Sequence, residues 1–172
     1  MTEDYDAVVY DLDGTLVRLD VDWAAVEREV GAILREAGVD PDDHDTWELL
    51  TAAEAAGVGD AVHDRIADHE LGGAETGPLL PTAGELPLDV PVGVCSLNAE
   101  VACRRALDRH DLAAWVAVVA GRDSVPARKP DPRALEWVAD ELGVDVERVL
   151  FVGDSASDEE TAERAGADFR WV

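Results

Sequence analysis

Five short apolar runs divide the chain and indicate buried strands, because parallel strands covered on both faces are apolar throughout rather than alternating. These runs occupy residues 7–10, 92–95, 115–119, 149–152 and, most weakly, 169–172. Helical patterns separate the later runs, at 98–109, 131–142 and 157–165. Strands that alternate with helices favour right-handed crossovers. The pattern therefore predicts an α/β fold with a doubly wound, parallel, five-stranded sheet.

The region between the first two strands lacks strand-like runs and is helical in pattern. Three helices are expected, at 22–37, 46–56 and 58–71, with a break at Gly57 and an end at the pair 72–73. We therefore expect a core domain formed by 1–16 and 83–172, interrupted by a helical insertion at 17–82. Trp23 and Trp47 are interpreted as part of the small core of this insertion rather than as a platform for the substrate, which is the alternative.

The net charge of the chain limits its possible binding partners. The 172 residues carry a formal net charge of −25, while 47% hydrophobic content still favours a globular protein. Such a charge repels nucleic acid and anionic membrane surfaces, so neither is an expected partner. Of 14 basic residues 13 are arginine, and Lys129 is the single lysine. Abundant acid with little lysine resembles proteins of salt-accumulating halophiles, in which salt screens the self-repulsion.

Location is expected to be cytoplasmic. The acidic start of the chain differs from a secretory signal, and no run approaches the roughly 18 apolar residues of a membrane span. Cys95 and Cys103 are too few for a disulfide framework or a zinc site, so we expect two reduced, packed thiols.

Chemistry-bearing side chains follow the predicted strands. In an open α/β sheet, ligands bind beyond the carboxyl ends of the strands. The residues expected at that rim are Asp11, Asp13, Gly14, Thr15, Ser96, Asn98, Lys129, Gly153, Asp154, Ser155 and Asp158. Carboxylates, a hydroxyl and one ammonium together suit a divalent metal and a phosphate, since Mg²⁺ prefers oxygen ligands.

The first-strand acids suggest a specific chemistry. With a metal offsetting charge, Asp11 could attack phosphorus and form an aspartyl phosphate. Asp13 is placed to protonate the leaving oxygen and then to deprotonate water. Ser96 could hydrogen-bond a phosphate oxygen, and Lys129 would supply a compact positive charge.

These segments resemble the four motifs of the haloacid dehalogenase superfamily. The matching residues are 11–16 (DLDGTL), Ser96, 129–132 (KPDP) and 153–158 (GDSASD). The resemblance covers about 1–17 and 90–172, and the helical insertion sits where one cap type of that family is found. It implies a Rossmann-like core with a small helical cap.

The resemblance also implies residue roles. Asp11 would be the nucleophile and Asp13 the general acid and base, with Lys129 as a further catalytic residue. Asp11, the backbone carbonyl of Asp13 and Asp154 would hold Mg²⁺, with support from Asp158. An Asp at position 13 is typical of the phosphatase and phosphotransferase branch rather than of the dehalogenases.

Substrate contacts are expected from Thr15, Ser96 and Asn98. One departure concerns Leu97, which separates Ser96 from Asn98, whereas many relatives place Asn directly after the serine or threonine. Asn98 therefore has two open interpretations, a substrate contact or a cap of the following helix.

The expected function is hydrolysis of a small phosphorylated metabolite, and a phosphoglycolate phosphatase-like role is the nearest resemblance. A phosphomutase or phosphotransferase on the same core is an alternative, as is a catalytically silent relative that binds phosphate and Mg²⁺. Receiver domains also bear a phosphorylated Asp, but they carry it after the third strand. The sequence leaves the substrate and the oligomeric state open.

Overall fold

A five-stranded parallel sheet with strand order β3-β2-β1-β4-β5 forms the core of the molecule. The computed structural model describes residues 4–43 and 46–172, and the side chains of 43–48 are outside the description. The strands are β1 (Ala7–Tyr10), β2 (Val92–Cys95), β3 (Val118–Ala120), β4 (Val149–Gly153) and β5 (Asp168–Trp171). The predicted α/β class and doubly wound parallel sheet are confirmed.

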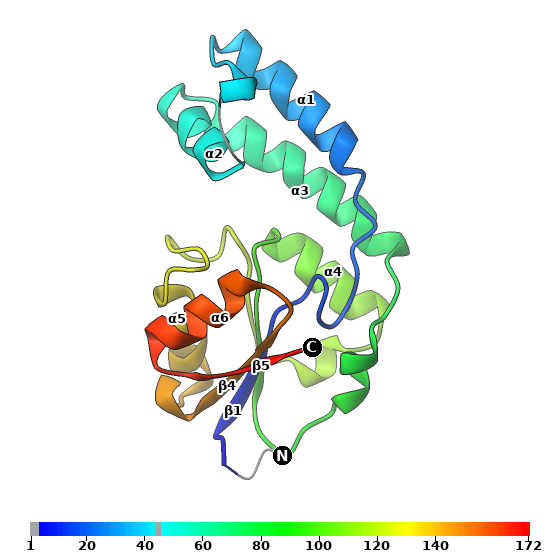
Figure 1. Cartoon of the computed structure of the whole chain (residues 1–172). Helices are drawn as coiled ribbons and strands as arrows, with labels where there is room; N and C mark the ends of the chain where they lie inside the picture. Colours follow the sequence, from blue (N-terminus) through cyan, green and yellow to red (C-terminus); the bar gives the residue numbers. More distant parts are fainter. Residues whose placement is uncertain (1–3, 44–45) are drawn as a thin grey trace.

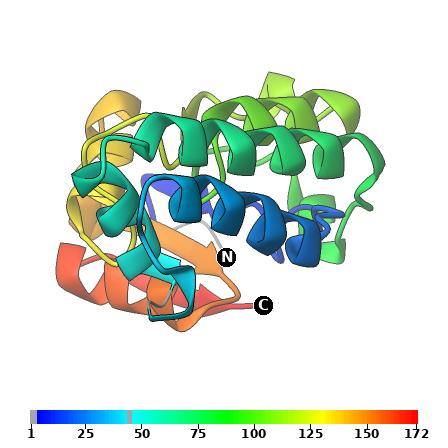
Figure 2. The ribbon, with the colours of Figure 1, turned by 90° about the horizontal axis from the view of Figure 1, so that it is seen from above.

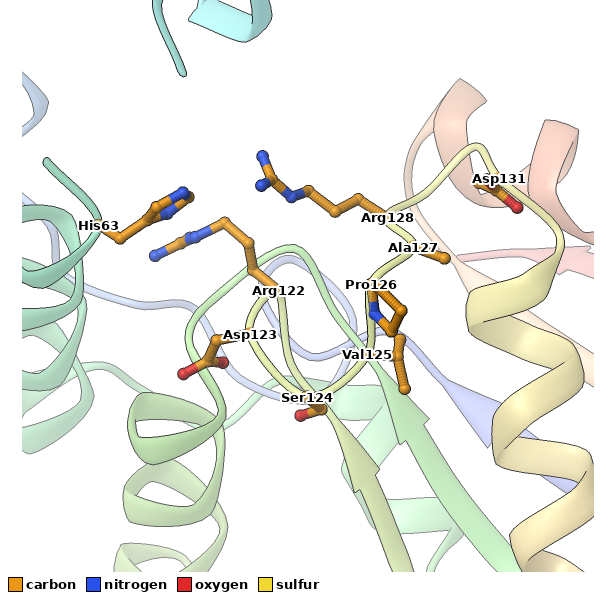
Figure 3. A pocket seen from close by; sticks show the side chains of 9 residues that line it. All are labelled: His63, Arg122, Asp123, Ser124, Val125, Pro126, Ala127, Arg128 and Asp131. Carbon is orange, nitrogen blue, oxygen red and sulfur yellow. The ribbon is translucent and has the colours of Figure 1, made fainter. Parts of the chain in front are cut away.

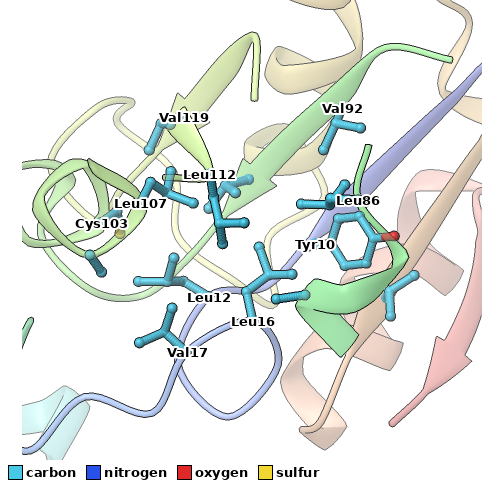
Figure 4. Packing of buried hydrophobic residues seen from close by; sticks show 14 of the residues in the cluster. Tyr10, Leu12, Leu16, Val17, Leu86, Val92, Cys103, Leu107, Leu112 and Val119 are labelled. Atoms are coloured by element: carbon cyan, nitrogen blue, oxygen red, sulfur yellow. The ribbon is translucent and has the colours of Figure 1, made fainter. Parts of the chain in front are cut away.

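Helices cover both faces of this sheet. They are α4 (Glu100–Arg109), α5 (Arg133–Leu142) and α6 (Ala156–Ala165). Side chains of β1 alternate between two hydrophobic clusters, as the two-residue period of a strand requires. Val8 and Tyr10 belong to one cluster with Leu107 of α4, and Figure 4 shows Tyr10 and Leu107 in it. Ala7 and Val9 belong to the other cluster, with Leu135 of α5.

Three helices are inserted between β1 and β2 and lie above the carboxyl ends of the strands (Figure 1). They are α1 (Trp23–Glu36), α2 (Thr46–Ala55) and α3 (Gly59–Thr76). Asp22 caps α1 by accepting a hydrogen bond from the Ala25 N–H at 3.0 Å. Short 3₁₀ turns occupy Pro41–Asp43, Pro81–Glu85, Ala113–Trp115 and Val146–Arg148. The expected helical insertion is therefore present, while its exact bounds at 17 and 82 stay a prediction.

The insertion has its own small core and rests on the sheet domain through α3. Val26, Val30, Leu34, Leu50 and Val62 are buried together in it. Helix α3 lies beside α1 on one side and beside α4 on the other, as the view from above shows (Figure 2). The predicted core residue Trp47 lies outside the residues whose side chains are described.

Two predicted boundaries are wrong. The third strand starts at Val118 rather than at 115, because the chain first makes a 3₁₀ turn in which the Trp115 N–H bonds the Leu112 carbonyl. Helix α3 continues through Gly72 and Gly73 to Thr76 instead of ending there. A Cβ on Gly73 would lie 2.9 Å from the Asp20 carbonyl carbon, so this glycine serves close packing and not helix termination. Among the described residues, no helix is long and apolar enough to cross a bilayer.

Candidate active site

The segment after β1 turns sharply beneath the insertion. The Asp11 N–H bonds the Val152 carbonyl of the neighbouring strand at 2.9 Å, which fixes Asp11 at the rim with only 6% exposure. Gly14 has φ of +91°, and a Cβ there would lie 2.0 Å from Asp154 Oδ2. Only glycine allows this backbone conformation and this approach, so the turn sequence brings two distant carboxylates together.

A second carboxylate pair follows β4. Ser155 caps α6, and its hydroxyl accepts a hydrogen bond from the Asp158 N–H while Asp158 Oδ2 accepts from the Ser155 N–H. This reciprocal capping box fixes the fully buried Asp158. Asp154 remains exposed at the rim. Asp158 therefore does start a helix, but its other oxygen has a further partner at the centre of the site.

That partner is Lys129, which is almost completely buried. Its ammonium donates to Asp11 Oδ1 at 2.8 Å and makes an even closer contact with Asp158 Oδ1. Carboxylate oxygens of Asp11, Asp154 and Asp158 all lie within 4.8 Å of one another. Residues from three separate parts of the sequence thus meet at one point of the rim.

Burial is the largest single influence on the pKa values of these groups. It raises the pKa of Asp11, against the opposing effect of the Lys129 ammonium, and it also raises the pKa values of Asp13 and Asp154. For Lys129, burial alone would lower the pKa, but the negative charges of Asp11 and Asp158 outweigh it and raise the pKa. The lysine therefore stays charged and offsets part of the crowded negative charge.

Asp13 lines the same cavity and is hydrogen-bonded to the start of the insertion. Its Oδ1 accepts a hydrogen bond from the Leu19 N–H at 2.8 Å. Leu19 lies in the segment that leads from β1 into α1. The predicted general acid is consequently held by the same chain segment that carries the insertion.

Ser96 and Asn98 follow β2 and hydrogen-bond to each other. The Ser96 hydroxyl donates to Asn98 Oδ1 at 3.0 Å and accepts from the Asn98 N–H at 3.2 Å. Helix α4 has Ala99 at its N-cap and no side-chain cap there. Capping by Asn98 is therefore wrong, because its amide group is committed to Ser96 and to Glu70.

Glu70 of α3 is the carboxylate that binds the segment after β2, and it was not predicted from the sequence. It is 1% exposed and accepts hydrogen bonds from Asn98 Nδ2 at 3.1 Å and from the Ala99 N–H at 2.9 Å. It also pairs in bidentate fashion with Arg122, at 2.9 and 3.1 Å. A charged residue on a helix pattern normally faces solvent, so no sequence signal marked Glu70.

Arg122 was also missed, although a signal existed. It lies two residues after the end of β3, at the rim where functional groups are expected. Its guanidinium is buried and donates to the Leu97 carbonyl as well as to Glu70. The sequence pattern predicted that the third strand ends at 119, one residue too early, and Arg122 was not placed at the rim. The neighbouring Asp123 accepts a hydrogen bond from the Glu100 N–H at 2.7 Å.

These groups surround a cavity of about 300 Å³ between the insertion and the sheet. Its lining residues are Asp11, Asp13, Trp23, Leu50, Ile66, Glu70, Leu97, Asn98, Arg122, Lys129, Asp154 and Ser155. The expectation that Trp23 belongs to the core of the insertion is wrong, since this side chain is 50% exposed and lines the cavity. A helical period places it on the same face as Val26, but it is the first residue of α1 and extends beyond that core.

The other predicted site residues lie beside this cavity without lining it. Ser96, Thr15 and Asp158 are buried. The Thr15 hydroxyl has no hydrogen-bond partner among the residues that the structure describes. Substrate contacts of Thr15, Ser96 and Asn98 therefore stay predictions.

A larger cavity of about 750 Å³ adjoins the site and shares Arg122 with it. Figure 3 shows His63 and Arg128 on opposite sides of this space, with Arg122 between them. Glu54 of α2 contacts both flanking groups, 3.0 Å from Arg128 and 3.7 Å from the His63 ring nitrogen. Asp11, Asp154 and Lys129 line the smaller cavity and not the larger one, so we take the smaller one as the candidate active site.

Fold and site together define a family. The chain matches the haloacid dehalogenase-like hydrolases over residues 5–166, and it belongs to that family. It is an enzyme homologous to phosphoglycolate phosphatases, which are phosphoric monoester hydrolases.

Two related sequences and one solved structure show what this chain is similar to. Phosphoglycolate phosphatase of Neisseria meningitidis is 30% identical, over 95% of this chain and 78% of the relative. Phosphoglycolate phosphatase of Rhodospirillum rubrum is 33% identical, over 93% of this chain and 76% of the relative. The crystal structure of CbbY from Rhodobacter sphaeroides in complex with phosphate superimposes with a TM-score of 0.68 at 18% identity, over 97% and 85% of the two chains. The last likeness supports the fold alone.

Proposed function

We propose that this enzyme is a Mg²⁺-dependent phosphatase that hydrolyses a small phosphorylated metabolite through an aspartyl phosphate on Asp11. The observation that carries the proposal is the meeting of Asp11, Asp154 and Asp158 within 4.8 Å, with Lys129 bonded to two of them. The names of the relatives supply the chemical class, a phosphomonoester.

The donor set fits Mg²⁺. The oxygen atoms of clustered carboxylates at the mouth of a cavity are the ligands that this hard cation prefers. Asp11, Asp154 and the backbone carbonyl of Asp13 would hold the ion, and Asp158 would support it. When bound, Mg²⁺ neutralises charge so that a carboxylate can approach a phosphate dianion.

The residues divide the reaction into two transfers. Asp11 attacks phosphorus, the bond to the ester oxygen breaks, and Asp13 gives its proton to the departing alcohol. Asp13 then takes a proton from water as that water attacks the phosphorylated Asp11. Inorganic phosphate leaves, and both carboxyl groups return to their initial states. The elevated pKa of Asp13, caused by burial, favours the protonated form that the first transfer needs.

Two alternatives use the same core. A phosphomutase would transfer the phosphoryl group to another hydroxyl instead of water, and a silent relative would bind phosphate without turnover. The insertion above the cavity supports a role in excluding water and selecting the substrate. We further propose that the enzyme works in concentrated salt. The chain has 39 acidic and only 14 basic residues, and salt screens the repulsion between the excess negative charges. A cytoplasmic location stays a prediction.

The test is a panel of phosphorylated metabolites with purified protein, Mg²⁺ and molar KCl, and 2-phosphoglycolate is the reference compound. Release of inorganic phosphate supports the phosphatase, whereas isomerised phosphoester without free phosphate would indicate a mutase. No conversion of any compound, by protein shown to be folded, would contradict the proposal in favour of a silent relative. Repetition of the assay at low KCl tests the salt requirement.

A further inference from the structure

The described residues include six large apolar side chains with substantial exposure to solvent: Trp23, Leu79, Val101, Trp115, Trp171 and Val172. Of these, only Trp23 lines either of the two cavities. Isolated exposed apolar residues are common on protein surfaces and need no function. Trp23 differs, because a ligand bound in the candidate active site would cover part of its exposed surface.

Trp23 contributes little to the packing of the insertion. It is the first residue of α1 and is 50% exposed, whereas the buried cluster of the insertion includes Val26, about one turn further along the helix. The start of α1 is fixed by Asp22, which accepts a hydrogen bond from the Ala25 N–H. Internal packing and helix capping therefore do not account for an aromatic side chain at this position.

The segment between Asp13 and Trp23 is held in place by hydrogen bonds. The Leu19 N–H bonds Asp13 Oδ1 at 2.8 Å, and the Asp20 N–H bonds a carbonyl of α3 at 3.2 Å. The indole and the proposed general acid are thus carried by one fixed segment, and both line the cavity. Under the proposed function Asp13 protonates the oxygen of the departing alcohol. The alcohol portion of the substrate is therefore bound beside Asp13, in the space that Trp23 also lines.

Three further apolar side chains line the same cavity. Leu50 of α2 is buried in the core of the insertion, Ile66 of α3 packs against that core, and Leu97 follows β2. Packing holds these side chains in place, so together with Trp23 they form a preformed apolar wall. Cavities with an apolar lining and a few placed polar groups are typical of sites for small molecules.

The insertion contributes one polar residue to this cavity in the described part of the chain, and that residue is Glu70. Its carboxylate forms a buried ion pair with Arg122 of the sheet domain. Because the pair carries no net charge, apolar contact is the main interaction through which the insertion acts on the alcohol portion of the substrate.

We propose that Trp23 is a substrate-binding residue, and that the apolar wall selects phosphomonoesters whose alcohol portion has an apolar carbon skeleton. This inference rests on the proposed phosphatase function and narrows its substrate class. Each CH₂ group that moves from water onto the wall adds favourable binding energy. Because this contact is made away from phosphorus, the energy appears in kcat/KM. A cavity of about 300 Å³ suits a small alcohol, so short chains are the appropriate probes.

Methyl, ethyl and n-propyl phosphate test the inference, because this series keeps the charge and the leaving-group chemistry almost constant and changes the apolar surface. With wild-type enzyme, Mg²⁺ and one fixed KCl concentration, we expect kcat/KM to rise about two- to fourfold for each added CH₂. A flat or falling series would overturn the inference and leave the phosphatase intact. Turnover of other phosphomonoesters but of none in this series would do the same. Absence of turnover of every phosphomonoester would instead overturn the proposed function, and the inference with it.

A variant with a matched control assigns the effect to Trp23. Trp23→Ala removes the exposed aromatic surface of the wall, so the preference for n-propyl over methyl phosphate should fall about threefold or more. Trp115→Ala is the control, since this tryptophan is 41% exposed and does not line the cavity. The control should keep the wild-type preference. An unchanged preference in Trp23→Ala, or an equal loss in both variants, would overturn the assignment to Trp23.

Two further measurements separate a substrate contact from a structural role. Trp23→Phe keeps an aromatic ring at the same place and should retain most of the preference that Trp23→Ala loses. Inorganic phosphate has no alcohol portion, so its inhibition constant should differ by less than about twofold between wild type and Trp23→Ala. Equal losses of preference in the Phe and Ala variants, or a weakening of phosphate binding as large as the loss of preference, would contradict apolar contact with the alcohol. The wild-type series tests the inference even where a variant does not fold.

Discussion

Lys129 Nζ lies 2.8 Å from Asp11 Oδ1, although the two residues are 118 positions apart in the chain. The same ammonium contacts Asp158, so one buried cation joins the segment after β1 to the start of α6. In a chain with one lysine among 14 basic residues, that lysine occupies the point where two buried carboxylates meet. A compact ammonium fits there, whereas a planar guanidinium needs more room.

Replacement of Lys129 by Met should impair both activity and stability. We expect kcat/KM to fall about 100- to 1,000-fold, the usual effect of losing one charged group at a reacting centre. The free energy of unfolding at neutral pH should fall by about 3–5 kcal/mol, because Asp11 and Asp158 would be left buried without their cation. Denaturant titration and steady-state kinetics measure the two effects.

A control variant and the pH dependence of stability test the prediction for Lys129→Met. Arg128→Gln removes the neighbouring, partly exposed cation and should change the free energy of unfolding by less than about 1 kcal/mol. In Lys129→Met, loss of the ammonium that lowers the pKa of Asp11 should raise the folded-state pKa of this carboxyl further above its unfolded value. The variant should therefore gain stability relative to wild type as pH falls, and a stability gap independent of pH would argue against buried carboxylate repulsion.

Gly73→Ala should destabilise the protein by roughly 1–3 kcal/mol, because the new Cβ would overlap the Asp20 backbone at 2.9–3.0 Å. Gly72→Ala is the matched control, since a Cβ added at this adjacent helical position would meet nothing within 4 Å. That substitution should be neutral or stabilising by about 0.5–1 kcal/mol, the usual gain of Ala over Gly within a helix. Equal effects of the two substitutions in denaturant titration would refute close packing as the reason for Gly73.

Mg²⁺ should raise the melting temperature at constant ionic strength. At about 100 times the dissociation constant, binding adds about 2.7 kcal/mol, and each kcal/mol corresponds to about 2–4 °C for a chain of this size. Asp154→Asn should abolish the increase, whereas substitution of Asp89, an exposed carboxylate outside the cluster, should preserve it. An increase that persists in Asp154→Asn would show that the ion acts elsewhere. Thermal denaturation with and without chelator gives the values.

Cys95 and Cys103 should be unreactive in the folded protein. Both are buried, and burial raises the pKa of Cys95 to about 12 and that of Cys103 further. Because the thiolate is the reactive form, a thiol-specific reagent at pH 8 should modify neither residue under native conditions and both in denaturant. Rapid modification of either thiol in the native state would contradict their burial.

The sheet and the carboxylate cluster were predictable from sequence for a physical reason. Buried parallel strands must be apolar throughout, and whatever follows them must lie at one rim. Asp11, Asp154 and Lys129 could therefore be brought together without knowledge of any contact. The start of β3 could not be predicted, because Trp115 and Val116 are as apolar as the strand that follows them.

The insertion side of the site was less predictable. A helical pattern gives a face and not its partner, so the burial of Glu70 against Arg122 and the exposure of Trp23 depend on how the insertion packs on the sheet domain. Gly73 was similarly ambiguous, since a glycine at the end of a helical pattern is typical both of helix ends and of close contacts. Those contacts belong to the tertiary structure and leave no periodic trace in the sequence.

The central claim is that Asp11 is the nucleophile, and the most direct measurement is phosphate release by Asp11→Asn. The assay should use the best phosphomonoester from the panel, with Mg²⁺ and KCl at the wild-type optimum, and circular dichroism to establish that the variant is folded. We predict a loss of at least about 1,000-fold in kcat/KM with the fold retained. Phosphate release by the folded variant at the wild-type rate would contradict the account.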